Sequence, residues 1–243
     1  MFGASSKHSK EQDSGLAALQ LDALSSALAT HGLIPRGGFV FDLHDSAPPG
    51  PSGSPAKSVL LVGHAGPAIW PHFSRWREAQ PADLKNPLDT WSRALIGDVA
   101  EKSGARAVWP SDRPYLPFQQ WAMRAEGLKP SPLGILMHPE YGLWHAWRGA
   151  LLFDIELPIA PPEKPTHLCD VCAEKPCLKA CPVDAYSHSG FAYGDCLAHL
   201  RGPHGEPCRT AGCFDRNACP YGTDHRYPAD QQAFHMAAFA GLT

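Results

Sequence analysis

The stretch Cys169-Asp-Val-Cys172-Ala-Glu-Lys-Pro-Cys177-Leu-Lys-Ala-Cys181-Pro182 opens a segment that holds every cysteine of this chain. After a spacer come the remaining four, Cys196, Cys208, Cys213 and Cys219, the last of which precedes Pro220. Thiolates are the ligands of iron–sulfur clusters, and two four-iron clusters need eight of them. The runs C-x2-C-x4-C-x3-C-P and C-x4-C-x5-C-P are looser than the bacterial ferredoxin run, but both end in Cys-Pro. The segment therefore predicts two [4Fe-4S] clusters.

The two Cys-Pro pairs also predict how the ligands are shared. In the ferredoxin run the proline turns the chain, so that the last thiolate can reach the other cluster. This crossing assigns four cysteines to each cluster. The first cluster takes Cys169, Cys172, Cys177 and Cys219, and the second takes Cys181, Cys196, Cys208 and Cys213.

Two other uses of eight cysteines have to be weighed. Four disulfides are typical of small secreted domains, whereas this chain is long and shows no signal peptide in Met1–Asp13. Two zinc ions would also accept four cysteines each, but zinc knuckles seldom end both halves with Cys-Pro. Iron–sulfur ligation is the reading that the spacing favours.

Composition excludes several classes of protein. The 243 residues carry a formal net charge of −3, with 44% hydrophobic and 19% charged residues. No basic run is dense enough to indicate nucleic-acid binding, and no apolar stretch is long enough to span a membrane. We expect a cytoplasmic protein with a disordered tail over 1–13, a cofactor-binding domain over 14–160 and a two-cluster domain over 161–243.

The pattern before the cysteines is that of an α/β domain. Ser14 and Gly32 bound an expected helix, and Asn86-Pro87 is expected to cap another that runs to about Ser103. Further helices are expected after Gly66-Pro67 and over Leu116–Ala125. The expected strands are Gly38–Asp42, Ser58–Gly63, Arg106–Trp109 and the apolar runs Leu133–His138 and Arg148–Leu157. A proline-rich linker, Pro158–Pro165, ends the domain.

Two polar features in this domain are candidates for chemistry. His138, Tyr141, Trp144 and Arg148 gather around an expected turn, a mixture that suits a large conjugated ligand. The alternative is a turn whose tryptophans fill the core and whose arginine pairs locally. Asp112, between Pro110 and Pro114, follows a strand end, where either a site residue or a solvated turn aspartate can stand.

The segment from Gly134 to Pro158, with His138-Pro-Glu-Tyr-Gly142-Leu-Trp144 and Arg148-Gly149, resembles the CblC cobalamin-processing family. Val59–Phe73 and the helix from Asn86 are similar to upstream parts of that family, so the likeness covers about 20–158. It implies a nitroreductase-like, CblC-like α/β (α+β) domain with a mixed sheet, followed here by a small ferredoxin-like domain.

The complete layout resembles epoxyqueuosine reductase, a cobalamin-dependent family with two [4Fe-4S] clusters. The resemblance places Asp112, which precedes Ala122-Met-Arg-Ala125, on the family's proton-donating aspartate. The family's lysine-bearing turn is replaced here by Glu126-Gly-Leu-Lys-Pro-Ser-Pro132. Its tRNA-holding helical repeats have no counterpart before Thr243, so a nucleic-acid substrate is not expected.

The sequence thus predicts an iron–sulfur oxidoreductase that passes electrons to a cobalamin bound near His138, Tyr141, Trp144 and Arg148. The expected partners are a low-potential electron donor of ferredoxin or flavodoxin type and a small-molecule or corrinoid substrate. Two alternatives stay open. One is a ferredoxin-type electron carrier whose front domain is a docking module, and the other is a flavin-dependent iron–sulfur reductase.

Overall fold

The computed structural model describes residues 19–162, 164–187 and 190–242, which form two compact units. Unit 1 comprises the described parts of Met1–His64, Pro71–Gly127 and Ala146–Glu163. Unit 2 comprises those of Ala65–Trp70, Leu128–His145 and Lys164–Thr243. The sequence-based division at 160/161 put 65–70 and 128–145 in the first domain, whereas the structure places both segments with the cysteines.

The sheet belongs to unit 1 apart from two strand ends, and its order is β1-β2-β6-β3. Its strands are β1 (Ile34–Val40), β2 (Ser58–Ala65), β3 (Arg106–Val108) and β6 (His145–Phe153). β1 pairs antiparallel with β2, and β3 pairs antiparallel with β6. All of β2 except its last residue is buried, which agrees with the unbroken apolar run expected of an interior strand.

Two of these strands differ from their predicted bounds. β1 begins at Ile34 rather than Gly38, because a register shift between Pro35 and Gly38 lets the chain pair earlier than its apolar run indicates. β6 begins at His145 and ends at Phe153. The predicted strand Arg148–Leu157 therefore lay too far toward the C-terminus. Polar side chains at the start of β6 interrupt the apolar pattern on which the prediction was based.

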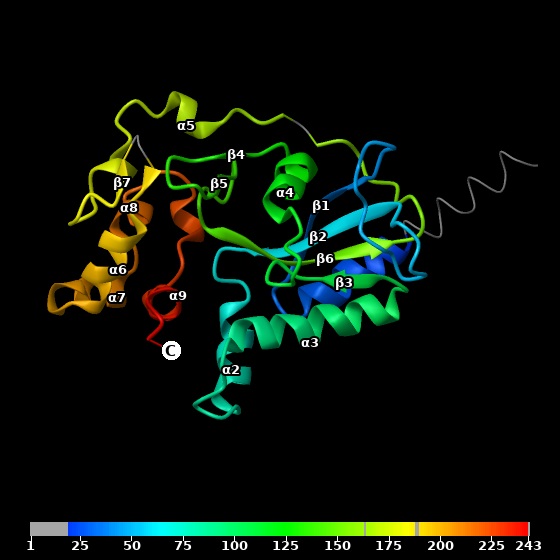
Figure 1. Cartoon of the computed structure of the whole chain (residues 1–243), viewed down its shortest axis with the longest axis horizontal. Coiled ribbons are helices and arrows are strands. Elements are labelled where there is room, and N and C mark those ends of the chain that lie inside the picture. Colours follow the sequence, from blue (N-terminus) through cyan, green and yellow to red (C-terminus); the bar gives the residue numbers. More distant parts are fainter. Residues whose placement is uncertain (1–18, 163, 188–189, 243) are drawn as a thin grey trace, which may run out of the picture. The chain divides into compact units, whose positions relative to one another are not determined.

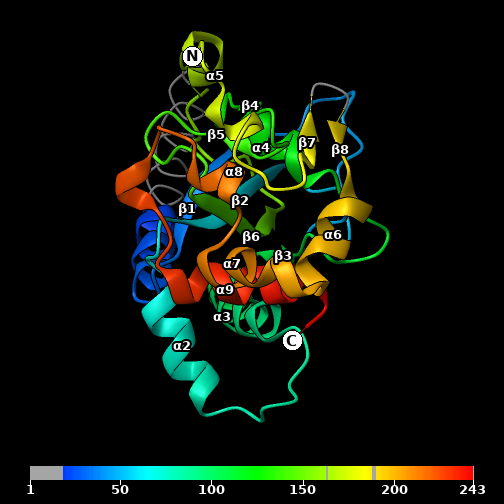
Figure 2. The same ribbon diagram turned by 90° about the vertical axis from the view of Figure 1, so that its left-hand side faces the viewer.

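The helices of unit 1 cover the sheet. They are residues 19–29, most of α2 (Trp70–Glu78), α3 (Pro87–Lys102) and α4 (Phe118–Glu126). α3 buries Leu88, Trp91 and Ile96, and Figures 1 and 2 both show it lying along one face of the sheet. α4 packs on β1, where a Cβ on Gly37 would lie 2.7 Å from the Ala125 carbonyl oxygen. The α/β class predicted from the sequence is confirmed.

Two helix ends were predicted from their capping residues. Gly32 closes the helix over 19–29 with φ +72°, as a C-terminal glycine should. Asn86 does not cap α3, because its φ is +50° and its side chain makes no capping bond. Pro87 does occupy the start of the helix. Ser14, Leu16 and the tail 1–13 lie outside the described residues.

Unit 2 is built from short elements around the cysteines. These are β4 (Lys129–Pro130), β5 (Leu136–Met137), α5 (Leu168–Val171), η1 (Pro176–Leu178), β7 (Tyr186–Ser187), β8 (Gly190–Phe191), α6 (Tyr193–Arg201), η2 (Pro203–Gly205), α7 (Glu206–Ala211), α8 (Phe214–Asn217), η3 (Thr223–His225) and α9 (Ala229–Ala240). Figure 2 shows α6, α7 and α9 grouped together, in agreement with their mutual contacts.

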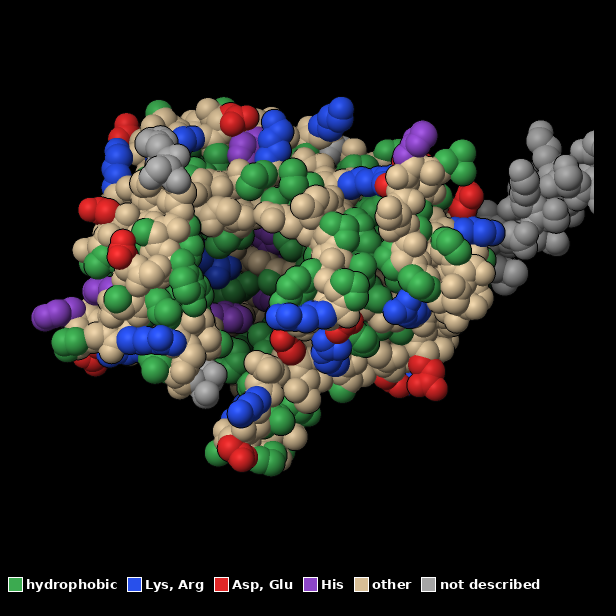
Figure 3. All heavy atoms as spheres, viewed as in Figure 1, with side chains coloured by type: hydrophobic (Ala, Val, Ile, Leu, Met, Phe, Trp, Pro, Cys, Tyr) green, Lys and Arg blue, Asp and Glu red, His purple; other side chains and the backbone are tan. Residues whose placement is uncertain are grey.

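In the part of the chain that the structure describes, no helix is long and apolar enough to cross a membrane. On the face drawn in Figure 3, Lys and Arg side chains are interspersed with Asp and Glu.

Candidate functional site

The eight cysteines are all free and lie in two neighbourhoods within unit 2. We name Cys169, Cys172, Cys177 and Cys219 the first cysteine set, and Cys181, Cys196, Cys208 and Cys213 the second cysteine set. Inside each set, neighbouring thiols raise the pKa of one another electrostatically. The structure thus brings the cysteines together in the same two groups as the crossed assignment, with Cys181 and Cys219 exchanged between the runs.

The first cysteine set is packed against the segment 133–143. Cys169, Cys177 and Cys219 share one buried cluster with Leu133, Met137 and Leu143. Burial, followed by the neighbouring Cys219 thiol, raises the pKa of Cys169 to about 11. Lys175 Nζ donates a hydrogen bond to the Cys169 carbonyl and lowers that pKa in opposition. This packing explains why segment 128–145 belongs to unit 2.

The second cysteine set is packed among α6, α7 and α9. Cys208 is buried with Leu200 and Ala240, and Cys196 packs against the same cluster. Burial, followed by the thiols of Cys213 and Cys181, raises the pKa of Cys196 to about 11. The Ala185 N–H donates to Cys181 Sγ over 3.4 Å, and His199 Nε2 lies 3.7 Å from Cys208 Sγ.

Asp215 is a functional candidate that the sequence reasoning missed. Its residue is 0% exposed, and its Oδ1 accepts a hydrogen bond from the Ala180 N–H at 3.1 Å. Its Oδ2 is buried and has no hydrogen-bond partner among the described residues. Burial raises the pKa of Asp215, while main-chain donors at Ala180 and Cys181 lower it. The sequence shows only an aspartate two residues after Cys213, and nothing in the cysteine spacing indicates that its side chain is buried.

The donor chemistry of the two sets fits iron–sulfur clusters. Four thiolates per set is the complement that a [4Fe-4S] cluster takes. No three His, Cys, Asp or Glu side chains of the described ranges lie close enough together to hold a single metal ion.

The predicted turn around His138 lies in unit 2 and is held by hydrogen bonds among its own residues. His138 Nδ1 accepts from the main-chain N–H groups of Glu140 and Tyr141, both at 3.1 Å. The His138 and Tyr141 rings stack with centroids 4.0 Å apart. A Cβ on Gly142 would lie 2.2 Å from the Tyr221 carbonyl oxygen, so the turn is docked closely against the chain that follows Cys219.

Trp144 fills the core of unit 2. It is 0% exposed, and the Arg216 guanidinium lies 4.4 Å from its ring centroid. Tyr227 contacts the ring edge-on at 5.3 Å, and Arg216 Nη2 donates to the Leu143 carbonyl at 2.6 Å. The sequence placed Trp144 with Arg148, but the structure puts Trp144 in unit 2 and Arg148 in unit 1.

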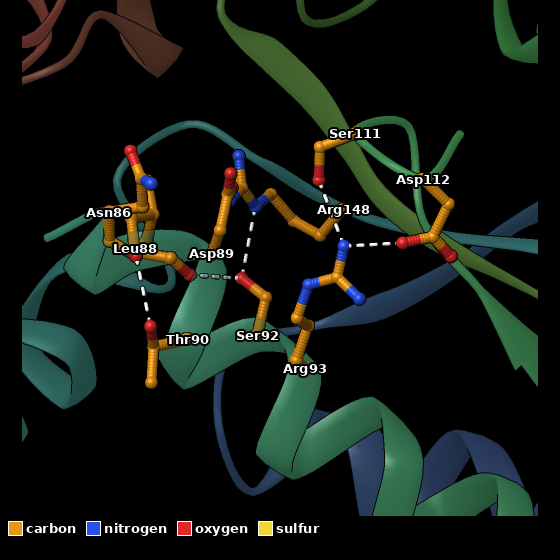
Figure 4. Close-up of polar contacts among 9 residues, drawn as sticks. All are labelled: Asn86, Leu88, Asp89, Thr90, Ser92, Arg93, Ser111, Asp112 and Arg148. Carbon is orange, nitrogen blue, oxygen red and sulfur yellow. Dashed lines mark hydrogen bonds and ion pairs between the residues drawn. The ribbon is translucent and has the colours of Figure 1, made fainter. Parts of the chain in front are cut away.

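Arg148 lines a cavity of about 130 Å³ in unit 1. Its other lining residues are Asp89, Arg93, Trp109, Pro110, Ser111 and Trp147. Arg148 donates to Ser92 Oγ at 3.0 Å and to Asp89 Oδ1 at 2.5 Å, at the start of α3. Figure 4 shows Arg148 reaching Ser92 from the neighbouring strand.

Asp112 stands beside the same cavity, held by Arg93. Arg93 Nη2 donates to Asp112 Oδ1 at 2.6 Å and to Ser111 Oγ at 3.0 Å (Figure 4). The Trp109 N–H donates to Asp112 Oδ2 at 3.2 Å, and the Arg93 guanidinium lies 4.5 Å from the Trp109 ring centroid. Arg148 therefore lines the cavity itself, and Asp112 is bonded to Arg93, which also lines it. The α3 residues Asp89 and Arg93, which hold Arg148 and Asp112, were not singled out from the sequence.

No protein-family model matches this sequence, and no curated protein matches it either. Among solved structures, the chain is similar to the B12-trafficking protein CblC of C. elegans, with 15% identity and a TM-score of 0.52 over 92% of this chain and 93% of that one. It is also similar to an epoxyqueuosine reductase from Bacillus subtilis. In that structure a catalytic loop that carries an aspartate is swung out of the active site. That match has 15% identity and a TM-score of 0.51, over 88% of this chain and 68% of that one.

Two further epoxyqueuosine reductase structures match at TM-scores below 0.5. One, bound to a tRNA stem loop, has 17% identity and a TM-score of 0.49 over 88% of this chain and 67% of that one. The other has 15% identity and a TM-score of 0.47 over 73% of this chain, which spans only 52% of that protein. The resemblance to CblC and epoxyqueuosine reductase is confirmed at the level of the fold.

Proposed function

We propose that this protein is an iron–sulfur oxidoreductase whose two cysteine sets each hold a [4Fe-4S] cluster. The observation that carries the proposal is the grouping of eight free thiols into two neighbourhoods of four. A structural zinc protein would explain four thiols per site equally well by number. Metal analysis separates the two.

We further propose that a corrinoid is the acceptor of the electrons. The support is the CblC-like fold together with the cavity in unit 1 that Arg148 lines. A corrinoid would supply the reductive chemistry when bound, while the protein supplies placement and electrostatics. The cavity of about 130 Å³ beside Arg148 is smaller than the 300–1,000 Å³ typical of sites for drug-sized ligands. It therefore suits one polar edge of such a ligand, or a small substrate.

The residues around this cavity have distinct proposed roles. Arg148 is oriented by Ser92 and Asp89, so that its guanidinium is fixed before a ligand arrives. Arg93 and the Trp109 N–H fix both carboxylate oxygens of Asp112. A carboxyl group fixed in this way can hold a proton at a defined place, the role that the resemblance assigns to Asp112.

The first test is metal and sulfide content. Anaerobically purified full-length protein should contain about eight irons and eight sulfides per chain, as two four-iron clusters require. Two zinc ions per chain, without visible absorption, contradict the proposal. Loss of the clusters in air should be followed by loss of order in unit 2, because metal binding is coupled to folding in cysteine-rich units.

The second test concerns the ligand of unit 1. The anaerobic full-length protein is mixed with hydroxocobalamin and, separately, with flavin mononucleotide, and each is followed by calorimetry. Corrinoid binding that weakens in Arg148→Gln supports the cobalamin-dependent reductase. Arg106→Gln serves as a matched control, because Arg106 is exposed, donates to the Pro49 carbonyl and does not line the cavity.

The other outcomes lead to the alternatives. Binding of flavin alone indicates a flavin-dependent iron–sulfur reductase. Binding of neither, in folded protein with full clusters, leaves an electron carrier whose first unit is a docking module. A tRNA stem loop is included as a third ligand, and its binding would correct the expectation that nucleic acid is not a partner.

A further inference from the structure

The cavity of unit 1 combines two arginines with two tryptophans. Arg93 and Arg148 both line it, and so do Trp109 and Trp147. A guanidinium matches the planar fork of a carboxylate and also stacks on aromatic faces. The cavity therefore offers hydrogen-bond donors for an anionic group and apolar walls for the carbon atoms that carry it.

Both arginines keep donors that the protein itself does not use. Arg148 donates through Nε and Nη2 to residues of α3, and Arg93 donates through Nη2 to Ser111 and Asp112 (Figure 4). The Nη1 group of each arginine has no hydrogen-bond partner among the described residues. Since a guanidinium carries five N–H donors in one plane, donors of both side chains remain for a ligand.

Trp109 brings a further donor to the cavity wall. Its Nε1 is buried and has no hydrogen-bond partner in the part of the chain that the structure describes. The ring is held by the Arg93 guanidinium, 4.5 Å from the ring centroid, and the Trp109 main-chain N–H donates to Asp112 Oδ2 at 3.2 Å. A buried N–H without an acceptor costs free energy, which an acceptor oxygen of a ligand in the cavity would recover.

Charge and size select the class of ligand. The lining holds two cations, Arg93 and Arg148, against one anion, Asp89, while Asp112 contacts Arg93 without lining the cavity. A single carboxylate compensates this surplus of one cation, whereas a neutral amide leaves it and a phosphate dianion exceeds it. The volume of about 130 Å³ is slightly below the roughly 150 Å³ of a protein cavity that holds benzene, so the carboxylate belongs to a small molecule.

Resting on the proposed function, we propose that the substrate of this reductase is a small organic carboxylate, anchored by Arg93 and Arg148 in the cavity of unit 1. The carboxylate oxygens accept from the unused N–H groups of the two arginines, and the rings of Trp109 and Trp147 contact the carbon chain. Arg93 also donates to Asp112 at 2.6 Å. The anchored carboxylate and the residue proposed to hold a proton are therefore joined by one guanidinium.

The experiment compares two probes of equal size on the anaerobic full-length protein. Propionate and propionamide differ in charge, and each is titrated while the indole N–H resonances are followed by nuclear magnetic resonance. The Trp109 resonance is identified by its absence from Trp109→Phe. Propionate should shift this resonance and bind roughly tenfold more tightly than propionamide, because hydrogen bonds to a charged acceptor are about twice as strong as neutral ones.

Failure of this inference is separable from failure of the proposed function. Iron and sulfide are measured first on the same sample, and their absence overturns the iron–sulfur proposal. Hydroxocobalamin is titrated separately, so that the corrinoid proposal and the carboxylate site are decided by different measurements.

Three variants test whether charge is the cause. Arg148→Gln should weaken propionate binding about tenfold and leave propionamide binding unchanged. Asp89→Asn removes the anion of the lining, keeps a side-chain oxygen for Arg148, and should strengthen propionate binding by about two- to fivefold. Arg106→Gln is the control and should change neither, since Arg106 is exposed on β3 and does not line the cavity.

Equal binding of propionate and propionamide, or propionate binding that leaves the Trp109 resonance in place, would overturn the inference. Inorganic phosphate is the third probe, and tighter binding of phosphate than of propionate would also contradict a carboxylate site. If Arg148→Gln fails to fold, Asp89→Asn still decides, because a damaged cavity cannot explain tighter binding. Weaker propionate binding in folded Asp89→Asn would refute the role of charge.

Discussion

Replacing Arg36 with methionine should destabilise unit 1 strongly. Arg36 is 2% exposed, and its Nε and Nη2 donate to the two carboxylate oxygens of Glu126 at 2.6 and 2.8 Å. Its Nη1 donates to the His64 carbonyl at 3.2 Å, and its guanidinium lies 4.9 Å from the ring centroid of Trp147, a cavity residue. One side chain therefore ties β1, β2, α4 and β6 together.

The magnitude follows from the charge that is left behind. Removing one partner of a buried ion pair typically costs about 3–5 kcal/mol, because the other charge stays buried without compensation. An exposed pair on the same unit provides the comparison. Lys102 and Asp98, 2.7 Å apart on α3 and both exposed, should contribute only about 0.3–0.5 kcal/mol, so Lys102→Met is a matched control.

The loss of unfolding free energy in Arg36→Met should also depend on pH. Burial raises the pKa of Glu126, and the Arg36 guanidinium lowers it in opposition, so Arg36→Met leaves the raising effect alone. A carboxyl whose folded-state pKa exceeds its unfolded pKa contributes stability below the unfolded pKa, and this is lost as pH rises through the folded pKa. The deficit of Arg36→Met should therefore be smaller at about pH 5 than at about pH 8.

Urea unfolding of the two variants, with hydrogen exchange of the β2 amides as the readout for unit 1, measures the effect. Glu126→Leu combined with Arg36→Met should recover much of the loss, because no uncompensated charge remains. A loss below about 1 kcal/mol for Arg36→Met alone, or a deficit that grows as pH falls, would refute the reasoning.

Three further results are expected. Cys219→Ser should remove the cluster signal of the first cysteine set and leave the Cys181 cluster comparatively intact in spectroscopic titration; loss of the Cys181 cluster instead would mean that each run binds its own cluster. Gly142→Ala should lower the melting temperature of the holo protein, because Gly142 has φ +57° and a Cβ there would meet the Tyr221 carbonyl; a cost under about 1 kcal/mol would mean that the close contact relaxes easily. Asp112→Asn should reduce turnover more than ligand binding in kinetic and calorimetric measurements, and equal losses would make Asp112 a binding residue.

Several features were readable from local sequence alone. The Cys-Pro ends of the two runs predicted the exchange of Cys181 and Cys219, which the thiol grouping matches, since a proline restricts the chain wherever it stands. β2 was readable because a buried strand needs an unbroken apolar run, and the start of α3 because Pro87 suits a first helical turn. These patterns depend on residues that are neighbours in the chain.

The tertiary structure alone decided which distant residues meet. The aromatic turn looked like one ligand site, yet Trp144 is enclosed by Arg216 and Tyr227, and Arg148 pairs with Asp89 across 59 positions. Arg93 donates a hydrogen bond to Asp112, and Asp215 accepts one from the Ala180 N–H before Cys181. No local sequence pattern predicts either bond. A charged side chain gives the same local sequence signal whether it is solvated or buried. Its partner is fixed only when folding removes it from water and an unpaired charge becomes costly.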